Sequence, residues 1–320
     1  MKYSLLALLL CPLVHSGAWA ADSMRALVVT DGKLHMESVP IPVPQAGQVR
    51  IRVRAASVNP VDWKLAERAA PGAHTIPGRD LAGVIDAVGP GAGAWRAGQS
   101  VIAIATGGAY ADYAIASVRA VALKPVHMSF EEAAGMPVVG ETAWRAIVTV
   151  GNVQAGQRVL IEGGAGGVGS SAVQIAKARG ALVIATASPS HDALLHSLGA
   201  DQIIDYHRAN FEDSLKNLDV VVSTADPESG IRSIRSIRTG GVLVSVVGAP
   251  PAAPCAAARI RCAITGPVSG EFLGALTELA DHGQFRINID QRLPLADAAK
   301  AWELNRAGHT GGKIILEVSH

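Results

Sequence analysis

Hydrophobic and polar positions follow one rhythm up to about residue 140 and a different one after it. Before that point, short hydrophobic runs are separated by turns rich in Pro and Gly, a pattern typical of an irregular β domain. Beyond it, strand-like runs alternate with helix-like segments, which is typical of a parallel sheet with helices on both faces. The early runs are residues 26–30, 49–55, 82–88 and 100–105; the later strands are 158–162, 182–186, 202–204, 219–223 and 242–247, and the helices are 168–179, 191–198 and 271–282. The sequence therefore predicts an α/β protein in which a mostly-β domain precedes a doubly wound parallel sheet.

Three segments need separate treatment. A helix at 295–306 and a strand at 313–318 have no place in this alternation. Residues 249–254 read Ala-Pro-Pro-Ala-Ala-Pro, and the three prolines predict an extended connection rather than a helix. In 231–238, isoleucines at spacing three form an apolar stripe facing the core, which leaves three arginines as a solvated face rather than a phosphate-binding patch.

The composition is that of a globular protein without a nucleic-acid-binding surface. The 320 residues include 28 Lys and Arg against 27 Asp and Glu, so the basic excess that binding to a phosphate backbone needs is missing. Hydrophobic residues make up 49% of the chain, which excludes a disordered protein, and the length favours two domains.

The first twenty residues resemble a secretory leader, a signal peptide at 1–20. Lys2 precedes an apolar run at 5–14, and Ala18-Trp19-Ala20 offers a small-x-small cleavage site. The run is too short for a permanent membrane span, so we expect no stable span after leader removal. A start at Met24, where a β-type run begins, would remove the leader. An exported, periplasmic protein and a cytoplasmic one therefore both stay open.

The cysteines give no metal or redox motif. Cys11 lies in the leader, and Cys255 and Cys262 have a C-x6-C spacing that matches no usual zinc or redox motif. We expect these two to be buried or idle thiols rather than a disulfide.

A glycine-rich loop opens the second half of the chain. The strand at 158–162 runs into Gly163-Gly164-Ala165-Gly166-Gly167-Val168-Gly169, and a helix and another strand follow. Gly164, Gly166 and Gly169 match G-x-G-x-x-G in the setting that gives this motif its meaning. The first glycine allows the tight turn, the second lets the backbone approach a pyrophosphate, and the third lets helix and strand touch. Because a helix N-terminus attracts phosphates, the loop predicts a dinucleotide site.

The end of the next strand favours NADP over NAD. A carboxylate there would hold the ribose 2′-hydroxyl of NAD, but the residues are Ala187-Ser188-Pro189-Ser190-His191. Two hydroxyls and an imidazole can receive a 2′-phosphate. No Arg stands at this turn and Asp192 follows it, and a role of Ser188 or Ser190 as a helix cap is an equally good interpretation.

Motifs spread over nearly the whole chain after Met24 resemble those of a known superfamily. They are Asn59-Pro60-Val61-Asp62-Trp63-Lys64, residues 77–84 and 108–113, Glu141-Thr142-Ala143-Trp144, and residues 166–169, 198–201, 204–206 and 312–316. Together they are similar to the medium-chain dehydrogenase/reductase superfamily, specifically its zinc-less quinone oxidoreductase branch. The resemblance implies a GroES-like catalytic domain at 24–139, a Rossmann NADP-binding domain at 140–283, and a C-terminal return to the catalytic domain at 284–320. It also implies a homodimer.

The resemblance further implies which residues contact the cofactor. Asn59 and Thr142 would contact the nicotinamide end, and Val247-Gly248 would pass near the nicotinamide ribose. The pyrophosphate would be bound by Gly166, Gly167 and Val168 in the loop shaped by Gly164 and Gly169, and the adenosine-phosphate end by Ser188 with Tyr206.

The same resemblance argues against a metal. Zinc-dependent members carry a Cys near the position of Asn59 and Gly-His-Glu where this chain has Gly78-Arg79-Asp80. His35, His74 and His127 are scattered, with no acid or thiol at ligand spacing, whereas catalytic zinc needs about three protein ligands. We therefore expect no metal.

Without a Lewis acid, reduction needs an acceptor that is already electrophilic, such as a quinone, an enone or an enoyl ester. The cofactor carries the hydride chemistry, and the protein supplies orientation and a proton or hydrogen-bond donor. The candidate catalytic residues are Asn59, Asp62 and Lys64, although Asp62 and Lys64 fit a surface ion pair equally well. Tyr110 and Tyr113 carry phenolic donors but fit a structural role better, and a bound water is a further candidate.

Three hypotheses for the function follow. The first is a zinc-independent, NADPH-dependent oxidoreductase that acts on small-molecule quinones or other conjugated carbonyls. The alternative enzyme is an enoyl-thioester or alkenal double-bond reductase. The alternative from another class is a nicotinamide-binding protein without turnover, which would suit an exported form because NADPH is scarce outside the cytosol.

Overall fold

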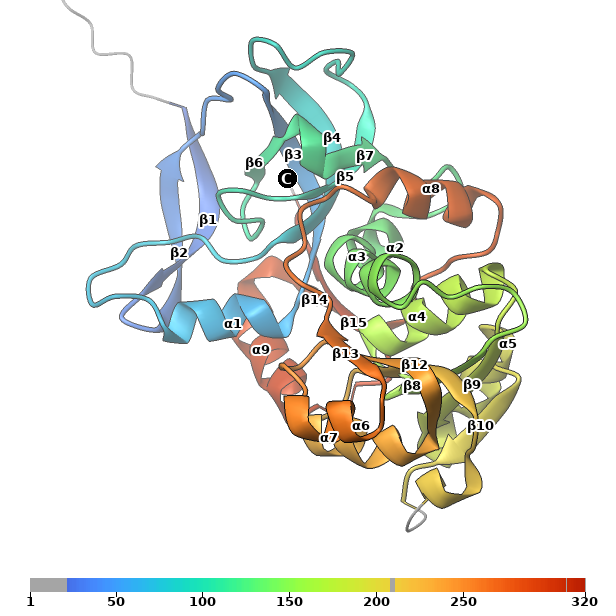
Figure 1. The fold of residues 1–320 in the computed structure, drawn as a ribbon. Helices are drawn as coiled ribbons and strands as arrows, with labels where there is room; N and C mark the ends of the chain where they lie inside the picture. The colour runs from blue at the N-terminus through green and yellow to red at the C-terminus, as the bar shows by residue number, and fades with distance from the viewer. Residues whose placement is uncertain (1–21, 208–210, 309, 320) are drawn as a thin grey trace, which may run out of the picture.

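The computed structural model describes residues 22–207, 211–308 and 310–319 (Figure 1). The predicted leader at 1–20 lies outside these residues. Every helix within the described ranges is too short or too polar to cross a bilayer.

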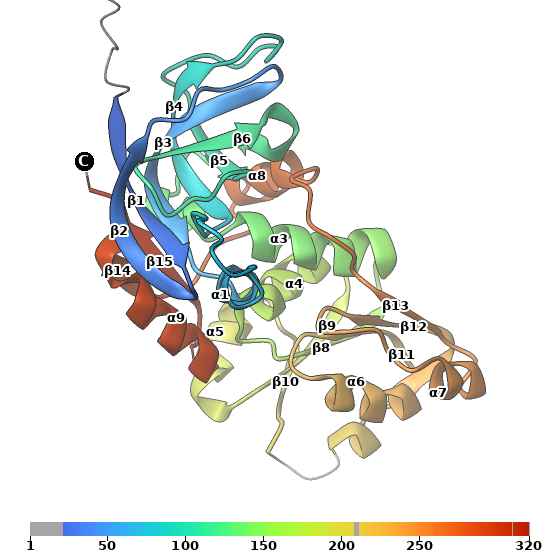
Figure 2. The same cartoon turned by 90° about the vertical axis from the view of Figure 1, so that its left-hand side faces the viewer.

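Six parallel strands form the sheet of the second half, in the order β10-β9-β8-β11-β12-β13. Counted from β8, this is the 3-2-1-4-5-6 order of the doubly wound nucleotide-binding fold. Figures 1 and 2 show α3 and α4 on one face of this sheet and α6 and α7 on the other, so its central strands are buried on both faces. The bounds are β8 Arg158–Glu162, α4 Gly167–Ala178, β9 Leu182–Ala187, α5 Asp192–Ser197, β10 Gln202–Asp205, β11 Leu218–Ser223, α6 Pro227–Ser233, β12 Ile237–Ser245, α7 Ala252–Ala257 and β13 Arg261–Ile264.

The first half folds around a mostly antiparallel sheet in the order β14-β15-β3-β4-β5-β7, with β6 paired to β3 and a separate β1-β2 hairpin. Its bounds are β1 Ser23–Thr30, β2 Lys33–Pro40, β3 Gln48–Ser57, α1 Pro60–Glu67, β4 Asp80–Val88, β5 Ser100–Ile104, β6 Tyr113–Ser117, β7 Val121–Leu123, α2 Phe130–Ala134 and α3 Pro137–Trp144. The predicted fold class, a GroES-like mostly-β domain plus a Rossmann sheet, is confirmed.

The C-terminal segment joins the first sheet. α8 Leu273–Asp281 is followed by β14 Ile289–Pro294, α9 Ala298–Ala307 and β15 Lys313–Glu317. β15 runs antiparallel to β3, with Ile315 opposite Ser57. This pairing gives the last helix and strand the place that the alternating pattern lacks. The domain boundaries at 139/140 and 283/284 stay a prediction.

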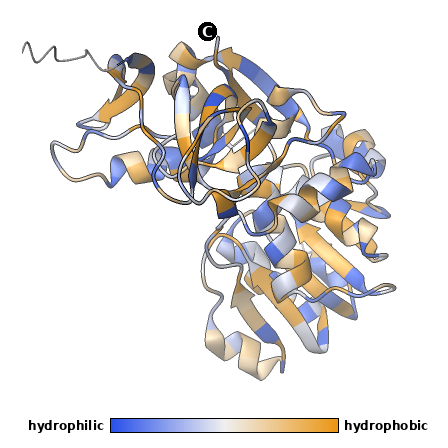
Figure 3. Cartoon of the chain, turned by 90° about the horizontal axis from the view of Figure 1, so that it is seen from above, coloured by the Kyte–Doolittle hydropathy of each residue, from blue (hydrophilic) through white to orange (hydrophobic). Residues whose placement is uncertain are grey.

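One hydrophobic core joins the two sheets through α3. It contains Ile102 and Ile104 of the first sheet, Val159 and Ile161 of β8, and Val139 of α3, all buried. Figure 3 shows that hydrophobic segments concentrate in the strands of both parts. Because side chains in a close-packed core interdigitate, this shared core fixes the relative position of the two sheets.

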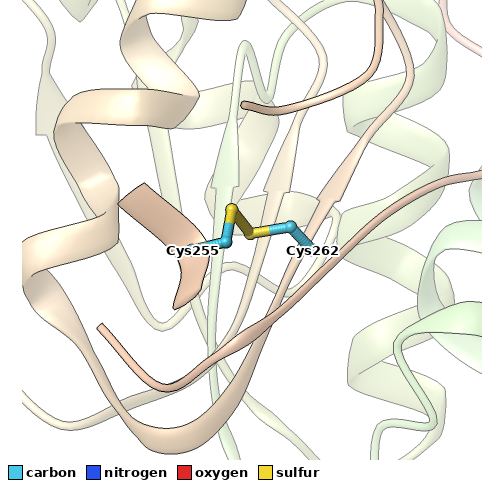
Figure 4. The surroundings of a disulfide bond; sticks show 2 residues. All are labelled: Cys255 and Cys262. Carbon is cyan, nitrogen blue, oxygen red and sulfur yellow. A yellow bond between two sulfur atoms is a disulfide. The ribbon is translucent and has the colours of Figure 1, made fainter. Parts of the chain in front are cut away.

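Cys255 and Cys262 form a disulfide, with their Cα atoms 6.1 Å apart (Figure 4). The prediction of two separate thiols is therefore wrong. The chain reverses between α7 and β13, where Arg259 adopts a left-handed backbone with φ of 53°, and this turn brings the two residues together. A turn at a non-glycine residue leaves little trace in the sequence.

The prediction of an extended connection at 249–254 is wrong from Ala252 onward, because α7 begins there. Pro254 lies in the first turn of α7, where its missing N–H would have no intrahelical acceptor. Prolines so close to a helix start are compatible with the helix that follows.

The run at 231–238 behaves largely as its apolar stripe predicts. Ile234 and Ile237 are buried, although α6 ends at residue 233 and a strand begins at 237. Arg232 and Arg235 are about half exposed and pair with the buried Glu212 at 2.9 and 3.4 Å. These arginines therefore also neutralise a buried acid.

Candidate active site

The glycine loop lies where the strand order reverses, between β8 and β11. A Cβ on Gly169 would lie 2.1 Å from the carbonyl oxygen of Gly163, and a Cβ on Gly164 would lie 2.9 Å from the Ala185 side chain. Both positions therefore require glycine for close packing. Gly166 differs, because an added Cβ would meet nothing nearer than the Gly163 oxygen at 3.5 Å. Gly166 is also the N-cap residue of α4 and has no side chain to cap the helix, which leaves the first N–H groups of the helix available to an anion.

A cavity of about 1020 Å³ opens along this loop, and we call it the switch-point cavity. Among the predicted site residues it is lined by Asn59, Lys64, Gly166, Gly167, Val168, Ser188, Tyr206 and Val247. Gly164, Gly169, Gly248 and Thr142 are not among its lining residues. The Thr142 hydroxyl donates to the Val138 carbonyl at 2.7 Å within α3. The cavity thus brings together residues from both halves of the chain.

The end of β9 supplies a hydroxyl and imidazole cluster to this cavity. Ser188 Oγ lies 2.9 Å from His191 Nδ1 and 3.1 Å from Ser190 Oγ. Neither serine side chain caps the helical turn that follows, so the capping interpretation lacks support. Tyr206, at the end of β10, is 52% exposed and its ring stacks on His207.

Asn59 is buried at the N-terminus of α1 and all its polar groups are engaged. Nδ2 donates to Asp80 Oδ2 at 2.8 Å, and Oδ1 accepts a hydrogen bond from Lys313 Nζ at 2.7 Å. The backbone N–H donates to Asp62 Oδ2 at 2.8 Å. Lys313 Nζ also donates to the Val58 carbonyl at 2.9 Å. The side chain of Asn59 is thereby locked in one orientation at the wall of the switch-point cavity.

Asp62 is 3% exposed, and its two carboxyl oxygens differ in their hydrogen bonds. Oδ2 accepts hydrogen bonds from the Asn59 backbone and from the Tyr110 hydroxyl at 3.0 Å. Oδ1 is buried without a hydrogen-bond partner among the described residues. Burial, reinforced by the charge of Asp80, raises the pKa of Asp62 to about 7. Burial likewise raises the pKa of Asp80 to about 6 and lowers that of Lys313.

A surface ion pair between Asp62 and Lys64 is excluded by this burial. Lys64 is exposed, and its Nζ lies 5.2 Å from the ring centre of Trp63. Tyr110 is fully buried and supports Asp62, in line with a structural role.

A second cavity, of about 1040 Å³, lies along the other side of α1, and we call it the α1 cavity. Asp62 and Leu65 of α1 line it together with Arg79, the chain after β5 and Ser269. Most of its wall is hydrophobic side chain. The first turn of α1 therefore contributes to both cavities, since Asn59 lines one and Asp62 the other.

Glu141 holds Ser269, the residue from the second half of the chain that lines the α1 cavity. It is fully buried, and its carboxylate accepts hydrogen bonds from the backbone of Ser269 at 2.7 Å and of Gly270 at 2.5 Å. This contact explains the acidic residue of the Glu-Thr-Ala-Trp motif as an anchor for a distant segment.

The described residues include no group of three or more His, Cys, Asp or Glu side chains that could hold a metal ion. His35, His74 and His127 are exposed, and His74 Nε2 lies 2.9 Å from Glu37, a pairing that the spacing of the sequence does not indicate. Zinc independence stays a prediction.

The sequence analysis gave no chemical role to three charged residues at or beneath the candidate site, namely Arg79, Asp80 and Lys313. These three residues were noted only as members of the family motifs. A usable signal existed for Lys313, because a lysine within the predicted strand Lys-Ile-Ile-Leu needs a buried partner.

Known families and structures support this arrangement. Residues 45–126 match the alcohol dehydrogenase GroES-like domain family, and residues 198–316 match the zinc-binding dehydrogenase family. The chain is 31% identical to a chloroplastic quinone-oxidoreductase of Triphysaria versicolor, over 89% of this chain and 94% of that protein. It is 34% identical to the 2-methylene-furan-3-one reductase of Solanum lycopersicum, over 92% of this chain and 79% of that protein.

The fold is similar to that of the quinone oxidoreductase from Coxiella burnetii, with a TM-score of 0.82 and 30% identity over 93% of this chain and 100% of that one. Oxidoreductases of this kind bind a nicotinamide cofactor and act on a small molecule. The chain therefore belongs to the medium-chain dehydrogenase/reductase superfamily, as a quinone oxidoreductase-like member.

Proposed function

We propose that this chain is a zinc-independent, NADPH-dependent reductase of quinones or other conjugated carbonyls. The observation that carries the proposal is that one helical turn, the first of α1, lines both cavities, through Asn59 on one and Asp62 on the other. A cofactor lying along the glycine loop and an acceptor in the α1 cavity would come together at Asn59 and Asp62.

The residues of the switch-point cavity fit NADPH. The open space at Gly166 and the uncapped start of α4 fit a pyrophosphate. Ser188, Ser190 and His191 offer hydrogen bonds to a 2′-phosphate, with no carboxylate in the turn at 187–191 to repel it. When bound, NADPH supplies a hydride to the acceptor. Asn59 is held rigidly enough to position the nicotinamide end, and the exposed ammonium of Lys64 adds a positive charge to the same wall.

Asp62 is the proposed proton donor. Its Oδ2 already accepts two hydrogen bonds, so the proton of the neutral carboxyl group belongs on Oδ1, which has no protein partner. Because the pKa is raised to about 7, a large share of Asp62 is protonated at neutral pH. Donation from Oδ1 to a carbonyl oxygen would neutralise the negative charge that develops there. A hydride and one proton together convert a quinone to a hydroquinone.

Purified protein tests this proposal directly. NADPH oxidation is followed with a benzoquinone, an enone and a crotonyl thioester, and bound zinc is measured by mass spectrometry. We expect turnover of the quinone and the enone by zinc-free protein. In Asp62→Asn, kcat should fall by about 100-fold or more, because a positioned general acid contributes at least that factor. The exposed Asp297→Asn is the control. Activity that depends on stoichiometric zinc would refute the proposal.

A double-bond reductase is the second candidate. Relatives include the 2-methylene-furan-3-one reductase named above and an NADPH-dependent alkenal/one oxidoreductase of Arabidopsis thaliana, 32% identical to this chain. An acid that is neutral near pH 7, such as Asp62, serves enone reduction as well as quinone reduction. Turnover of the thioester alone would favour an enoyl-thioester reductase, and tight binding without turnover of any acceptor would favour a non-catalytic role.

We also propose a homodimer. β13 is an edge strand of the parallel sheet, and its Ile264 is 51% exposed. An unpaired edge with an exposed hydrophobic side chain can pair with a second copy. Light scattering after size exclusion tests this assembly, and a monomer at micromolar concentration would refute it.

Export is the location that we propose. Disulfides persist in oxidising compartments, so the Cys255–Cys262 bond agrees with the leader-like segment at 1–20. N-terminal sequencing of the native protein decides the matter, since a start at Ala21 means export and a start at Met24 means cytoplasm.

A further inference from the structure

The α1 cavity contains a cationic side chain that forms no ion pair among the described residues. Arg79 lines the cavity, and its Nε is buried without a hydrogen-bond partner. Among the described residues, no ion pair joins its guanidinium to an acid. Arg52 and Arg158 also have a buried Nε without a partner, but neither lines either cavity. Arg79 alone of these three could therefore satisfy its Nε with a bound molecule.

The other ionisable groups that line this cavity do not neutralise Arg79. His74 is occupied by Glu37 at 2.9 Å. Asp62 is the one acid in the lining, and it is partly neutral near pH 7 because burial raises its pKa. Asp80 follows Arg79 in the chain and is near enough for the guanidinium charge to lower its pKa, but its oxygens accept hydrogen bonds from Asn59 and Val138 and none from Arg79. The hydrogen-bond donors of the Arg79 guanidinium therefore remain available to a molecule bound in the cavity.

The rest of the cavity determines what kind of anion fits. Leu65, Ile76 and Ile104 make its wall apolar, and about 1040 Å³ is ample for a ring or chain of drug size. Two residues of this lining each carry a buried polar atom without a partner among the described residues, Asp62 at Oδ1 and Arg79 at Nε. Both can donate a hydrogen bond, so the complementary molecule has an apolar body with two separate oxygen acceptors.

We propose that Arg79 is an anion-binding residue of the acceptor site, and that the preferred acceptor is a conjugated carbonyl compound bearing a carboxylate on an apolar body. The carbonyl oxygen lies at Asp62, and the carboxylate receives paired hydrogen bonds from the guanidinium fork. This assignment rests on the proposed function, which supplies the reaction, and adds the substrate class to it.

A matched pair of acceptors tests the assignment in steady-state assays. Cinnamaldehyde and 4-carboxycinnamaldehyde share the reacting group and the ring and differ by one distant carboxylate. In the wild type, we expect kcat/KM to be higher for the carboxylate. Arg79→Met should lower that value by about 10- to 100-fold, the usual effect of losing a hydrogen bond to a charged group. The value for cinnamaldehyde should change less than about threefold, and Arg79→Lys should be intermediate because it keeps the charge but loses the fork.

Arg52→Met is the control variant, since Arg52 shares the buried Nε but lies outside both cavities. Arg52→Met should leave kcat/KM for both acceptors unchanged. Equal kcat/KM for the two acceptors in the wild type, or equal losses for both in Arg79→Met, would overturn the assignment and leave the proposed function standing.

Direct binding separates the two proposals. Saturation-transfer NMR with benzoate and benzamide reports on the subsite without any turnover. Benzoate binding that is lost in Arg79→Met, in a protein that reduces no acceptor, would support the subsite and refute the proposed function. If Arg79→Met fails to fold, benzoate inhibition of the wild type decides. Benzoate that competes with the acceptor more strongly than benzamide supports the assignment, and equal inhibition by the two overturns it.

Discussion

Replacing glycines of the loop by alanine should separate cofactor binding from folding, because two glycines of the same motif face different surroundings. Gly166 has φ of −69° and ψ of 168°, a conformation open to alanine, and the nearest atom to an added Cβ is the Gly163 oxygen at 3.5 Å. Gly166→Ala should therefore leave the thermal stability of the cofactor-free protein unchanged or raise it slightly, by about 0.4–1 kcal/mol. The methyl group would instead occupy the space proposed for the pyrophosphate.

Gly169→Ala should do the opposite. Its Cβ would lie 2.1 Å from the Gly163 carbonyl oxygen and 2.8 Å from both the carbonyl carbon and Gly164 Cα, and these backbone atoms have no room to move apart. Overpacking of this kind costs about 1–3 kcal/mol, so the melting temperature should fall.

Isothermal titration with NADPH and thermal melting of the same samples measure both quantities. Gly166→Ala should lose at least one hydrogen bond to a charged phosphate, worth about 1.5–3 kcal/mol, which raises Kd by about 10- to 100-fold. Gly274→Ala is the control, since Gly274 lies exposed in α8 with nothing within 4 Å of an added Cβ. Wild-type affinity in Gly166→Ala would refute the placement of the pyrophosphate, and a wild-type melting temperature in Gly169→Ala would refute the packing argument.

Three further outcomes follow from the structure. Ser188→Asp puts a carboxylate at the end of β9, so the ratio of kcat/KM for NADPH to that for NADH should fall by about tenfold or more from charge repulsion, and an unchanged ratio would remove the 2′-phosphate from this turn. The pKa values of Asp62 and Asp80 are raised to about 7 and about 6 from a usual 3.8. At pH values between the usual and the raised pKa, the folded protein therefore binds more protons than the unfolded chain. The stabilisation from these two protonated groups is therefore complete below about pH 4 and is lost as pH rises through 6 to 7. Urea titrations at about pH 4.5 and 7.5 should show that the free energy of unfolding falls less between these pH values in Asp62→Asn than in the wild type. Replacing Cys255 and Cys262 by Ser should lower the free energy of unfolding by about 2–3 kcal/mol, the value for so short a closed loop, and dithiothreitol should give the wild type the same urea midpoint as the variant.

Local patterns were enough to predict the fold and the dinucleotide loop. The strand–glycine–helix order around Gly166 is contained in about a dozen consecutive residues, and the period of the hydrophobic positions distinguishes the two sheets. The proline segment at 249–254 misled because a proline in a first helical turn and a proline that prevents a helix have the same local sequence. The disulfide was missed because its turn depends on Arg259 at positive φ.

The buried polar cluster beneath the site was beyond local reasoning. The bond between Lys313 Nζ and Asn59 Oδ1 joins residues 254 positions apart, and it forms only because β15 pairs with β3. Arg79 and Asp80 are neighbours in the chain, yet one lines the α1 cavity while the other is wholly buried. The sequence at the start of β4 does not indicate which of these two side chains lines a cavity and which contacts a buried amide.

The charge balance of this cluster explains why Asp62 is the proposed acid. Lys313 brings a positive charge into a region that holds two carboxyl groups, those of Asp62 and Asp80, and Arg79 adds a further charge that acts on Asp80. The proton belongs on the carboxyl group whose pKa Lys313 influences least. Each carboxyl group accepts two hydrogen bonds, but those on Asp80 are spread over both oxygens, whereas both on Asp62 fall on Oδ2 and leave Oδ1 with none. Lys313 is the main influence that lowers the pKa of Asp80 and the weakest of the influences on Asp62. Asp62 therefore keeps its proton to higher pH, and that proton lies on the residue that lines the α1 cavity. The C-terminal strand thus does more than complete a sheet: the cation that it supplies favours the ionised form of Asp80 and leaves Asp62 as the proposed acid.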